Sequence, residues 1–280
     1  MYKEALMAGG WAVVTGGASG VGFAAAERFA HAGLSVMLAD LPGAALDNAA
    51  KSIGDILKTG AEVAAVPTDV SDVSAVQALA DAAFAHGEVA ILMNNAGIGL
   101  PSSCWDQANS WRTTLEVNLF GVINGLQAFL PRMVAADRPA VVINTGSKQG
   151  ITTPPGNPAY NVSKAGVKAA TESLAHELRE AGAPISSHLF VPGFTYTGMV
   201  AARISERPAA AWTSEQTVSY LISKMAAGDF YILCPDNDVS PERDKRRVKW
   251  AVGDIIENRP ALSRWHPDYA EAFADFEKSN

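Results

Sequence analysis

Short apolar runs alternate with segments of helical spacing along most of this chain. Residues 11–15 form the first run, and residues 20–32, which follow a cluster of glycines, carry apolar side chains at helical spacing. Residues 34–39 and 44–59 repeat this pairing. Further apolar runs, each preceded by a segment long enough for a helix, occupy residues 61–66, 89–93, 140–144, 185–191 and 230–233. The pattern predicts seven strands with six helical stretches between them.

The predicted strands are mostly apolar and lack the regular alternation of apolar and polar residues that a sheet with one solvent-exposed face shows. Continuous apolar strands joined by helical crossovers are typical of a parallel sheet that helices cover on both sides. The sequence therefore predicts an α/β fold, a single doubly wound, Rossmann-like domain with a seven-stranded parallel sheet and helices on both faces. Residues 198–213 show no strand pattern, and we expect a mobile flap there.

Composition changes near residue 235, where the chain becomes more charged. We interpret residues 1–235 as the main domain and residues 236–280 as a C-terminal helical extension packed on it. The formal net charge is −7, which argues against nucleic acid or an anionic membrane as partner. No segment reaches the roughly 18 uninterrupted apolar residues of a membrane span. Cys104 and Cys234 lie far apart, so we expect two reduced, partly buried thiols, no metal site and a soluble, cytoplasmic protein.

A glycine cluster lies where the first predicted strand meets the first predicted helix. Residues 15–22 read Thr-Gly-Gly-Ala-Ser-Gly-Val-Gly, and glycines there let the backbone approach a pyrophosphate at a helix N-terminus. Such clusters also serve as purely structural turns, but the position in the first strand–helix unit favours a dinucleotide. The residues expected to contact it are Gly16, Ser19, Gly20, Val21 and Gly22.

Asp40 ends the second predicted strand. A carboxylate there accepts hydrogen bonds from the ribose hydroxyls of an adenosine and repels a 2′-phosphate. Neither the glycine turn nor residues 41–43 carry an Arg or Lys that would pair with such a phosphate. The sequence therefore favours NAD(H) over NADP(H), while a role of Asp40 as a helix N-cap before Pro42 stays open.

Ser147, Tyr160 and Lys164 form a second candidate set. Ser147 follows the fifth strand, at the sheet edge where ligands of open α/β folds bind, and Tyr160 and Lys164 share one face of a predicted helix. An ammonium and a positively charged nicotinamide favour the phenolate of a tyrosine, whose ordinary pKa of about 10 is too high for a base at neutral pH. A serine hydroxyl can hold the substrate oxygen. An isolated Tyr-x-x-x-Lys pair is usually structural, but the nucleotide turn and Ser147 favour proton transfer.

These residues resemble the short-chain dehydrogenase/reductase family over roughly residues 10–233. The marks that carry the resemblance are the turn 15–22, Asp69-Val70, Asn94-Asn95-Ala96-Gly97, Trp111, Val117-Asn118-Leu119, Ser147, Tyr160, Lys164, Pro192-Gly193 and Thr197. The resemblance implies an NAD-dependent oxidoreductase that interconverts a secondary alcohol and a ketone, with the cofactor and catalytic sites in residues 1–235.

The resemblance also implies individual roles. Tyr160 would be the general acid/base, Ser147 would orient the substrate oxygen, and Lys164 would bind the nicotinamide ribose and lower the pKa of Tyr160. Asn118 would disturb its helix and hold a water in a proton relay to Lys164. The other implied cofactor contacts are Asp69 and Val70 at the adenine, Asn95 and Ala96 on the ribose side, and Pro192, Gly193, Thr195 and Thr197 at the carboxamide. An alternative for Asn94 and Asn95 is a turn that only stabilises the sheet edge.

Lys148 departs from the small or apolar residues that usually follow the serine of this family. It either points to solvent or adds a cation near the substrate, and we expect solvent. The residues expected to form an apolar rim, suited to an apolar or aromatic substrate, are Leu100, Pro154, Pro155, Phe194 and Met199. By resemblance we expect a homodimer or homotetramer, formed through the helices that hold Asn118 and Tyr160.

Two other classes of protein share part of this pattern. A regulatory nucleotide sensor would keep the fold without catalysis, but the complete set of Ser147, Tyr160, Lys164 and Asn118 argues against it. A methyltransferase would use a similar glycine turn, and it would leave the Tyr-x-x-x-Lys pair unexplained.

Overall fold

The structure, a computed structural model, describes residues 1–280 except 106–108, 202–203, 280 and the side chains of residues 199 and 279. The strands are β1 (Trp11–Thr15), β2 (Ser35–Asp40), β3 (Val63–Pro67), β4 (Val89–Asn94), β5 (Ala140–Thr145), β6 (Ile185–Val191) and β7 (Tyr231–Leu233). The helices are α1 (Tyr2–Ala8), α2 (Gly20–Ala32), α3 (Ala44–Ile56), α4 (Val73–His86), α5 (Ser110–Leu115), the π-helical turn η1 (Glu116–Phe120), α6 (Gly121–Ala135), α7 (Gln149–Thr152), α8 (Pro158–Glu180), α9 (Gly198–Ala201), α10 (Ser214–Ala227) and α11 (Pro241–Ile256), followed by the 3₁₀ turns η2 (Ser263–Trp265) and η3 (Pro267–Tyr269) and by α12 (Ala270–Ser279).

All seven strands form one parallel sheet, as the sequence predicts. Their order is β3-β2-β1-β4-β5-β6-β7. Strands β2 and β3 therefore extend the sheet on one side of β1, and β4 to β7 extend it on the other side, so the strand order reverses between β1 and β4. Ligands of doubly wound sheets bind at the carboxyl ends of the strands, beside such a reversal. The topology therefore fixes where a binding site should open.

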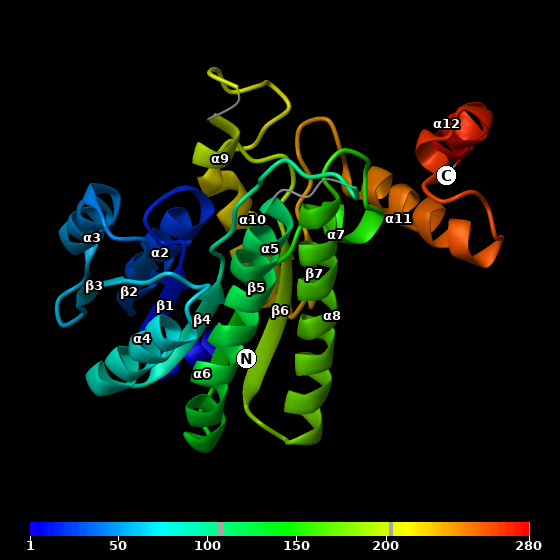
Figure 1. The fold of residues 1–280 in the computed structure, drawn as a ribbon. Helices are drawn as coiled ribbons and strands as arrows, with labels where there is room; N and C mark the ends of the chain where they lie inside the picture. Colours follow the sequence, from blue (N-terminus) through cyan, green and yellow to red (C-terminus); the bar gives the residue numbers. More distant parts are fainter. Residues whose placement is uncertain (106–108, 202–203, 280) are drawn as a thin grey trace.

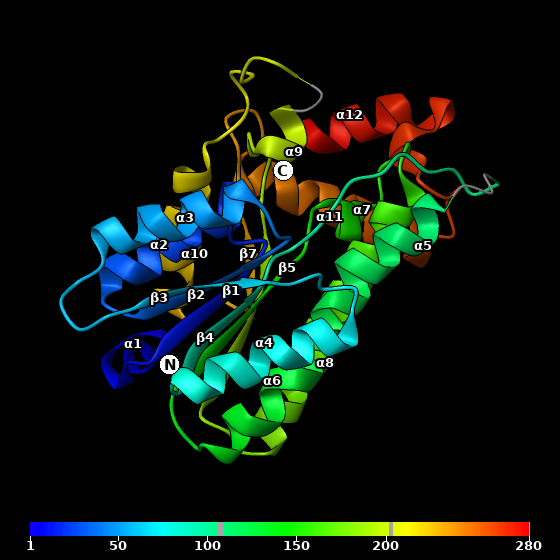
Figure 2. The same cartoon turned by 60° about the vertical axis from the view of Figure 1, so that its left-hand side comes forward.

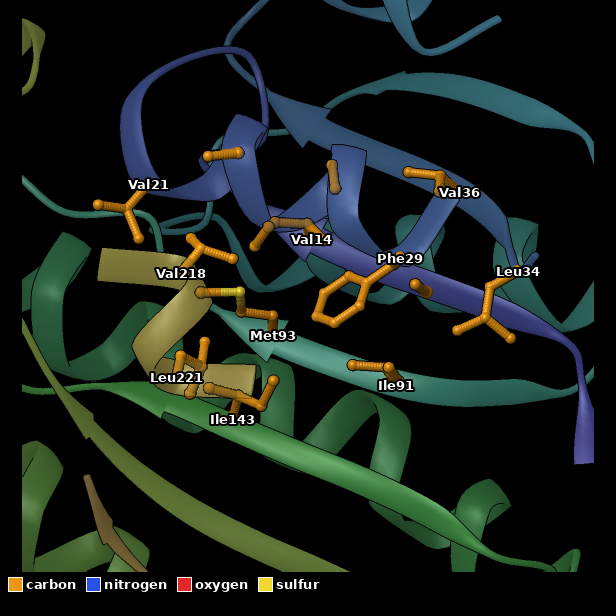
Figure 3. Packing of buried hydrophobic residues seen from close by; sticks show 14 of the residues in the cluster. Val14, Val21, Phe29, Leu34, Val36, Ile91, Met93, Ile143, Val218 and Leu221 are labelled. Carbon is orange, nitrogen blue, oxygen red and sulfur yellow. The ribbon is translucent and has the colours of Figure 1, made fainter. Parts of the chain in front are cut away.

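The apolar strands are explained by helices on both sides of the sheet (Figure 2). Along β1, Ala12 and Val14 belong to the core cluster beneath α2, α3 and α10, whereas Trp11 and Val13 belong to the cluster beneath α4, α6 and α8. Figure 3 shows the first cluster, where Phe29 of α2 lies over the sheet. Both faces are buried, so apolar residues occupy successive positions along most of the strands. Among the described helices, none has the length and apolar character needed to cross a membrane.

The boundaries differ from the sequence prediction by a few residues. The strand expected at 61–66 begins at Val63, because the N–H of Glu62 is taken by the Ser35 hydroxyl at 3.0 Å. The helix expected at 44–59 ends at Ile56, since Leu57 turns to an extended backbone. Within 198–213, outside Ala202 and Arg203, which the description does not cover, the chain forms the short helix α9. Cys234 is buried and Cys104 is exposed, so the expectation of partial burial was wrong for Cys104.

The C-terminal extension consists of α11, η2, η3 and α12. Helix α11 packs against α7, and α12 packs against α11 and the two turns. Trp250 of α11 contacts Phe273 and Phe276 of α12, with ring centroids 5.2 Å apart in both cases. Figure 1 shows α12 at the outer end of the extension, away from β1–β3. The extension thus meets the sheet domain through α11.

Candidate active site

The carboxyl ends of the strands open into a cavity of about 1000 Å³. Ligand pockets are typically about 300–1000 Å³, so this cavity has room for a dinucleotide and a substrate together. The expected site residues that line it are Gly16, Ser19, Gly20, Val21, Asp40, Asp69, Val70, Asn95, Ala96, Ser147, Tyr160, Lys164, Pro192, Gly193, Thr195 and Thr197. Two expected residues, Gly22 and Asn118, are not among its lining residues, and they contribute through packing and hydrogen bonds instead.

The glycine turn brings backbone to the cavity. Gly16 and Gly20 have φ angles of +65° and +56°, a conformation that favours glycine. A Cβ on Gly16 would lie 2.9 Å from the Cα of Ala96, and a Cβ on Gly22 would collide with the carbonyl of Gly16. Gly22 therefore allows the turn to fold on itself, while the N-terminus of α2 faces the cavity with its unpaired N–H groups, as a pyrophosphate requires.

Asp40 lies at the end of β2, beside this turn. Its carboxylate accepts hydrogen bonds from the N–H of Ala18 at 2.9 Å and from that of Leu41 at 2.8 Å. Helix α3 begins at Ala44 with Gly43 as its N-cap, so the alternative that Asp40 caps a helix is wrong. The backbone orients the carboxylate at the cavity, and the unused lone pairs can accept hydrogen bonds from hydroxyl groups.

The two asparagines after β4 serve mainly to join strands. Asn95 donates to the carbonyl of Thr15 at 3.2 Å and accepts from the Thr145 hydroxyl at 3.2 Å, so it ties β1, β4 and β5 together. Asn94 is buried and donates to the side chain of Asn144 at 2.8 Å. The alternative of a purely stabilising role at the sheet edge therefore fits Asn94. Asn95 both joins the strands and lines the cavity.

Asn118 lies in the π-helical turn between α5 and α6, and this wider turn is the local disturbance that was expected. Its Oδ1 accepts from the N–H of Ile98 at 2.7 Å, and its Nδ2 donates to the carbonyl of Ile98 at 2.9 Å and to the Ser163 hydroxyl at 3.2 Å. Both amide hydrogens are thus used to hold the loop after β4 against α8. A relay water would have to bind the remaining lone pair of Oδ1 or the main-chain carbonyl.

Ser147, Tyr160 and Lys164 converge in the cavity from the end of β5 and the first turns of α8. Ser147 is close enough to Tyr160 for a hydrogen bond to its phenol oxygen, and the Ser147 oxygen accepts from the N–H of Gln149 at 3.2 Å. The ammonium of Lys164 lies 5.8 Å from the centroid of the Tyr160 ring and donates to the carbonyl of Thr145 at 2.8 Å. A serine, a phenol and an amine are therefore within one site.

Burial is the main influence on the protonation of Tyr160 and Lys164. Burial raises the pKa of Tyr160 above its ordinary value, and the hydrogen bond to Ser147 opposes that rise. Burial also lowers the pKa of Lys164 to about 8. In the protein alone the phenol is therefore protonated at neutral pH, and an additional positive charge beside it would be needed to favour the phenolate.

Lys148 does not point freely to solvent, so that expectation was wrong. Its side chain is 22% exposed, and its ammonium lies 2.6 Å from Asp244 and 3.6 Å from Asp236. Asp244 belongs to α11 and Asp236 follows β7. The residue after Ser147 therefore joins the catalytic loop to the C-terminal extension, because two carboxylates from distant segments meet it there.

Some residues of the site were missed by sequence reasoning. A Cβ on Gly150 would lie 2.5 Å from the carbonyl oxygen of Lys164, so glycine lets the Ser147 loop pack on α8. Asn157 lines the cavity and caps α8 through the N–H of Tyr160 at 3.4 Å. The Asn-Pro pair at 157–158 is a helix-start signal that would have revealed this cap. Asp236, Val239 and Arg247 also line the cavity, and no local motif marks them.

Only part of the expected apolar rim is found. Phe194 lines the cavity, whereas Leu100, Pro154 and Pro155 are not among its lining residues. The side chain of Met199 lies outside the described residues. Apolar lining residues that were not anticipated, Val200, Ile204 and Val239, accompany Phe194.

A glycine turn at the reversal of a doubly wound sheet, with Ser147, Tyr160 and Lys164 in the same cavity, defines a nucleotide-dependent dehydrogenase as the class of protein. Comparisons with known proteins agree. The family model described as short chain dehydrogenase matches residues 10–208. The chain is 35% identical over 261 residues to 1-deoxy-11-beta-hydroxypentalenate dehydrogenase of Streptomyces exfoliatus, with 91% of this chain and 93% of the relative covered. The chain belongs to the short-chain dehydrogenase/reductase family.

Solved structures of this family share the fold. A short-chain dehydrogenase/reductase from Burkholderia phymatum in complex with NAD has a TM-score of 0.79 at 34% identity, with 90% of this chain and 96% of that chain covered. A metagenomic short-chain oxidoreductase in complex with NADP has a TM-score of 0.66 at 27% identity, with 80% and 96% covered. This chain is therefore an oxidoreductase of alcohols with a nucleotide cofactor, and relatives of both cofactor types share its fold.

Proposed function

We propose that the protein interconverts a secondary alcohol and a ketone with NAD(H), with Tyr160 as the general acid/base. The observation that carries the proposal is that Ser147, Tyr160 and Lys164 line one cavity together with the glycine turn. A bound nicotinamide dinucleotide supplies the hydride acceptor or donor. The protein has to bind the reactants, orient the substrate oxygen and move one proton.

The proton step follows from the hydrogen bonds of the site. The Ser147 oxygen accepts from the N–H of Gln149, and its single hydrogen, which can be donated to the Tyr160 oxygen in the protein alone, would be donated to the substrate oxygen when a substrate is bound. In alcohol oxidation, the Tyr160 phenolate takes the hydroxyl proton as the carbonyl forms, and in ketone reduction the phenol returns it. Burial raises the pKa of Tyr160, so the Lys164 ammonium and the positive charge of an oxidised nicotinamide are what favour the phenolate.

Lys164 is placed to stabilise that phenolate. Its ammonium donates to the Thr145 carbonyl at 2.8 Å, which fixes one of its three hydrogens and leaves two for a ribose hydroxyl or a relay water. Asn118 holds the loop after β4 beside this amine through its bonds to Ile98 and Ser163. We therefore assign Asn118 a positioning role, with any relay water held by its main-chain carbonyl or by Oδ1.

The cofactor preference is carried by Asp40. Its carboxylate lies at the cavity wall beside the glycine turn and would repel a 2′-phosphate, while its free lone pairs suit ribose hydroxyls. The φ angles of Gly16 and Gly20 and the N-terminus of α2 fit a pyrophosphate. We therefore expect kcat/KM to favour NAD over NADP by at least about 100-fold, which steady-state rates with both cofactors would measure.

The substrate is proposed to be a secondary alcohol on an apolar skeleton. Phe194, Val200, Ile204 and Val239 supply apolar lining to the cavity. The Streptomyces relative is named as a hydroxypentalenate dehydrogenase, and this name supports an alcohol substrate for a protein 35% identical to it. Buried apolar contacts contribute binding, while Ser147 and Tyr160 fix the reacting oxygen.

Replacing Tyr160 by phenylalanine tests the proposal. Tyr160→Phe removes the acid/base and keeps the ring, so turnover of alcohols with NAD should fall by about 10²–10⁴-fold or more. NADH binding, measured by its fluorescence, should stay close to that of the wild-type protein. Wild-type turnover in this variant would refute the role of Tyr160, and a protein that binds NADH but oxidises no alcohol would be a nucleotide sensor.

We also propose that two copies pair through the outer faces of η1 and α8. Phe120 and Val162 are large apolar residues on these elements, and they are 43% and 48% exposed. Exposed apolar side chains of this size on neighbouring helices suit a subunit interface. Size-exclusion chromatography with light scattering would detect the dimer or tetramer, and a monomer would contradict this assignment.

A further inference from the structure

The cavity extends beyond Tyr160 to a wall supplied by the C-terminal extension. The strand order places Asp40, the last residue of β2, on one side of the reversal and Asp236, after β7, at the opposite end of the sheet. Arg247 of α11 lines the same cavity as Tyr160. A dinucleotide whose adenosine ribose meets Asp40 has its reactive ring at Tyr160. The space between Tyr160 and Arg247 therefore belongs to the substrate.

Arg247 shares its carboxylate partner with a second arginine. Its Nε donates to Glu277 at 3.3 Å, and Arg243, one turn earlier on α11, donates to both oxygens of Glu277 at 3.1 and 3.2 Å. The side chain of Arg247 is 17% exposed. The hydrogen bond from Arg247 to Glu277 uses Nε. The terminal nitrogens of Arg247, which form the fork that matches a carboxylate, are not used in that bond.

Charged side chains of both signs surround Arg247. The cations gathered between Ser147 and α12 are Lys148, Arg243, Arg247 and Arg264, and the anions are Asp236, Asp238, Asp244 and Glu277. Of this group, Lys148, Arg247 and Asp236 line the cavity. Two cations and one carboxylate therefore form the charged part of this cavity wall.

The pKa values of two neighbouring side chains, Arg264 and Glu277, respond to the charges of these arginines. Burial, together with the positive charges of Arg247 and Arg243, lowers the pKa of Arg264 to about 10, although Glu277 opposes the shift. Burial would raise the pKa of Glu277, but its hydrogen bond from Arg243 and the charges of Arg243 and Arg247 outweigh burial and hold that pKa below its ordinary value. Burial is the largest cause of the shift at Arg264, and the charge of Arg247 contributes to both shifts, so the guanidinium of Arg247 is close to these two groups.

We propose that Arg247 binds a carboxylate of the substrate, at the end of the molecule away from the cofactor. The inference rests on the proposed function and narrows the substrate class to hydroxy acids, and the corresponding keto acids, with an apolar skeleton. Phe194, Val200, Ile204 and Val239 would contact the skeleton, while Ser147 and Tyr160 hold the oxygen that reacts. A partly buried guanidinium binds a carboxylate through two parallel N–H···O bonds and fixes its orientation.

The test compares matched acids and esters. The probes are hydroxycycloalkanecarboxylates of increasing ring size and the methyl ester of each, assayed with NAD. The wild-type protein should prefer one of the acids over its ester by about 10- to 100-fold in kcat/KM, mainly through KM, because the added contact is equal in ground and transition states. Arg247→Gln should abolish this preference, so that each acid and its ester react with similar kcat/KM. Arg247→Lys should retain part of it.

Arg243→Gln is the matched control. It removes the stronger of the two bonds to Glu277 but changes no residue that lines the cavity, so the preference for the acid should persist. Thermal unfolding of all three variants would confirm that they are folded. An Arg247→Gln variant that keeps the wild-type preference, or a wild-type protein that oxidises acids and esters equally, overturns the inference and leaves the proposed function intact. A wild-type protein that oxidises none of these alcohols overturns both.

Discussion

Lys164 and Lys148 flank the same serine loop, and their surroundings are of opposite kinds. Lys164 is 3% exposed, and its ammonium contacts the neutral carbonyl of Thr145. In the described part of the chain, no carboxylate lies within ion-pair distance of it. Lys148 is more exposed, yet it is paired with the carboxylates of Asp244 and Asp236. One amine is buried without a counter-ion, and the other has two.

The difference separates a reactive group from a structural one. A buried amine without a counter-ion lowers the stability of the protein, and such groups persist where their charge is used in chemistry. The position of Lys164 near the Tyr160 ring fits that use. An amine shared by carboxylates from two distant segments instead joins those segments. We therefore expect the two lysines to respond oppositely to the same substitution by methionine.

The largest effect should be on turnover. Lys164→Met removes the positive charge that favours the Tyr160 phenolate, so kcat/KM for alcohol oxidation should fall by about 10²–10⁴-fold. Oxidation by the wild-type protein should accelerate as pH rises, because Tyr160 must lose its proton first. In the variant the apparent pKa of this profile should move to higher pH, since burial, which raises the pKa of Tyr160, is then less opposed. Steady-state NADH production across pH measures both effects.

Lys148→Met is the control for this measurement. Its ammonium faces Asp244 and Asp236, so its removal should leave the apparent pKa of the profile in place even if the rate changes. An unchanged profile in Lys164→Met, or an equal displacement in both variants, would contradict the division between the two lysines.

The contrast between Lys164 and Lys148 also explains what could be predicted from the sequence. Features with a local signal were predicted, and features that depend on residues distant in sequence were not. The apolar runs predicted all seven strands, because strands buried on both faces leave a local signal that needs no tertiary knowledge. Lys164 was predicted because it shares a helix turn with Tyr160 inside a motif. Lys148 was placed wrongly, since its partners are distant in sequence and only the folded chain brings them together. Arg247 was missed for the same reason.

A smaller effect is expected on stability when Lys148 is replaced. Lys148→Met leaves the buried carboxylates of Asp244 and Asp236 close to each other without their shared cation. Removing one partner of a largely buried ion pair costs about 2–4 kcal/mol, so the free energy of unfolding should fall by that amount. Urea denaturation followed by circular dichroism measures it. Adding Asp244→Asn should restore part of the loss, because it removes one uncompensated charge.

Lys224→Met provides the comparison with an exposed pair. Lys224 lies 2.9 Å from Asp229 on the surface, where water screens the interaction, so its unfolding midpoint should match that of the wild-type protein. If Lys148→Met also left the unfolding midpoint unchanged, Lys148 would not stabilise the contact between the serine loop and α11.

The smallest and least intuitive effect concerns Lys164 in the protein without cofactor. Burial lowers the pKa of Lys164 from 10.5 to about 8, so folding weakens proton binding at this amine. The shift corresponds to a stability cost of about 3 kcal/mol, present in full below pH 8 and lost as pH rises toward the unfolded value of 10.5. Lys164→Met removes this cost but leaves the Thr145 carbonyl without its donor. We therefore expect a net gain of about 1–3 kcal/mol at pH 7.

The gain should decrease with pH, and this dependence identifies its origin. Above the unfolded pKa both states of the wild-type protein hold a neutral amine, so the variant loses its advantage. Urea denaturation of both proteins at a series of pH values between neutrality and the alkaline limit would show the two curves converging. A gain that is constant with pH would indicate better packing of methionine, and a loss would show that the Thr145 bond outweighs the buried charge. Either result would remove the argument that Lys164 is retained at a cost to stability because catalysis requires its charge.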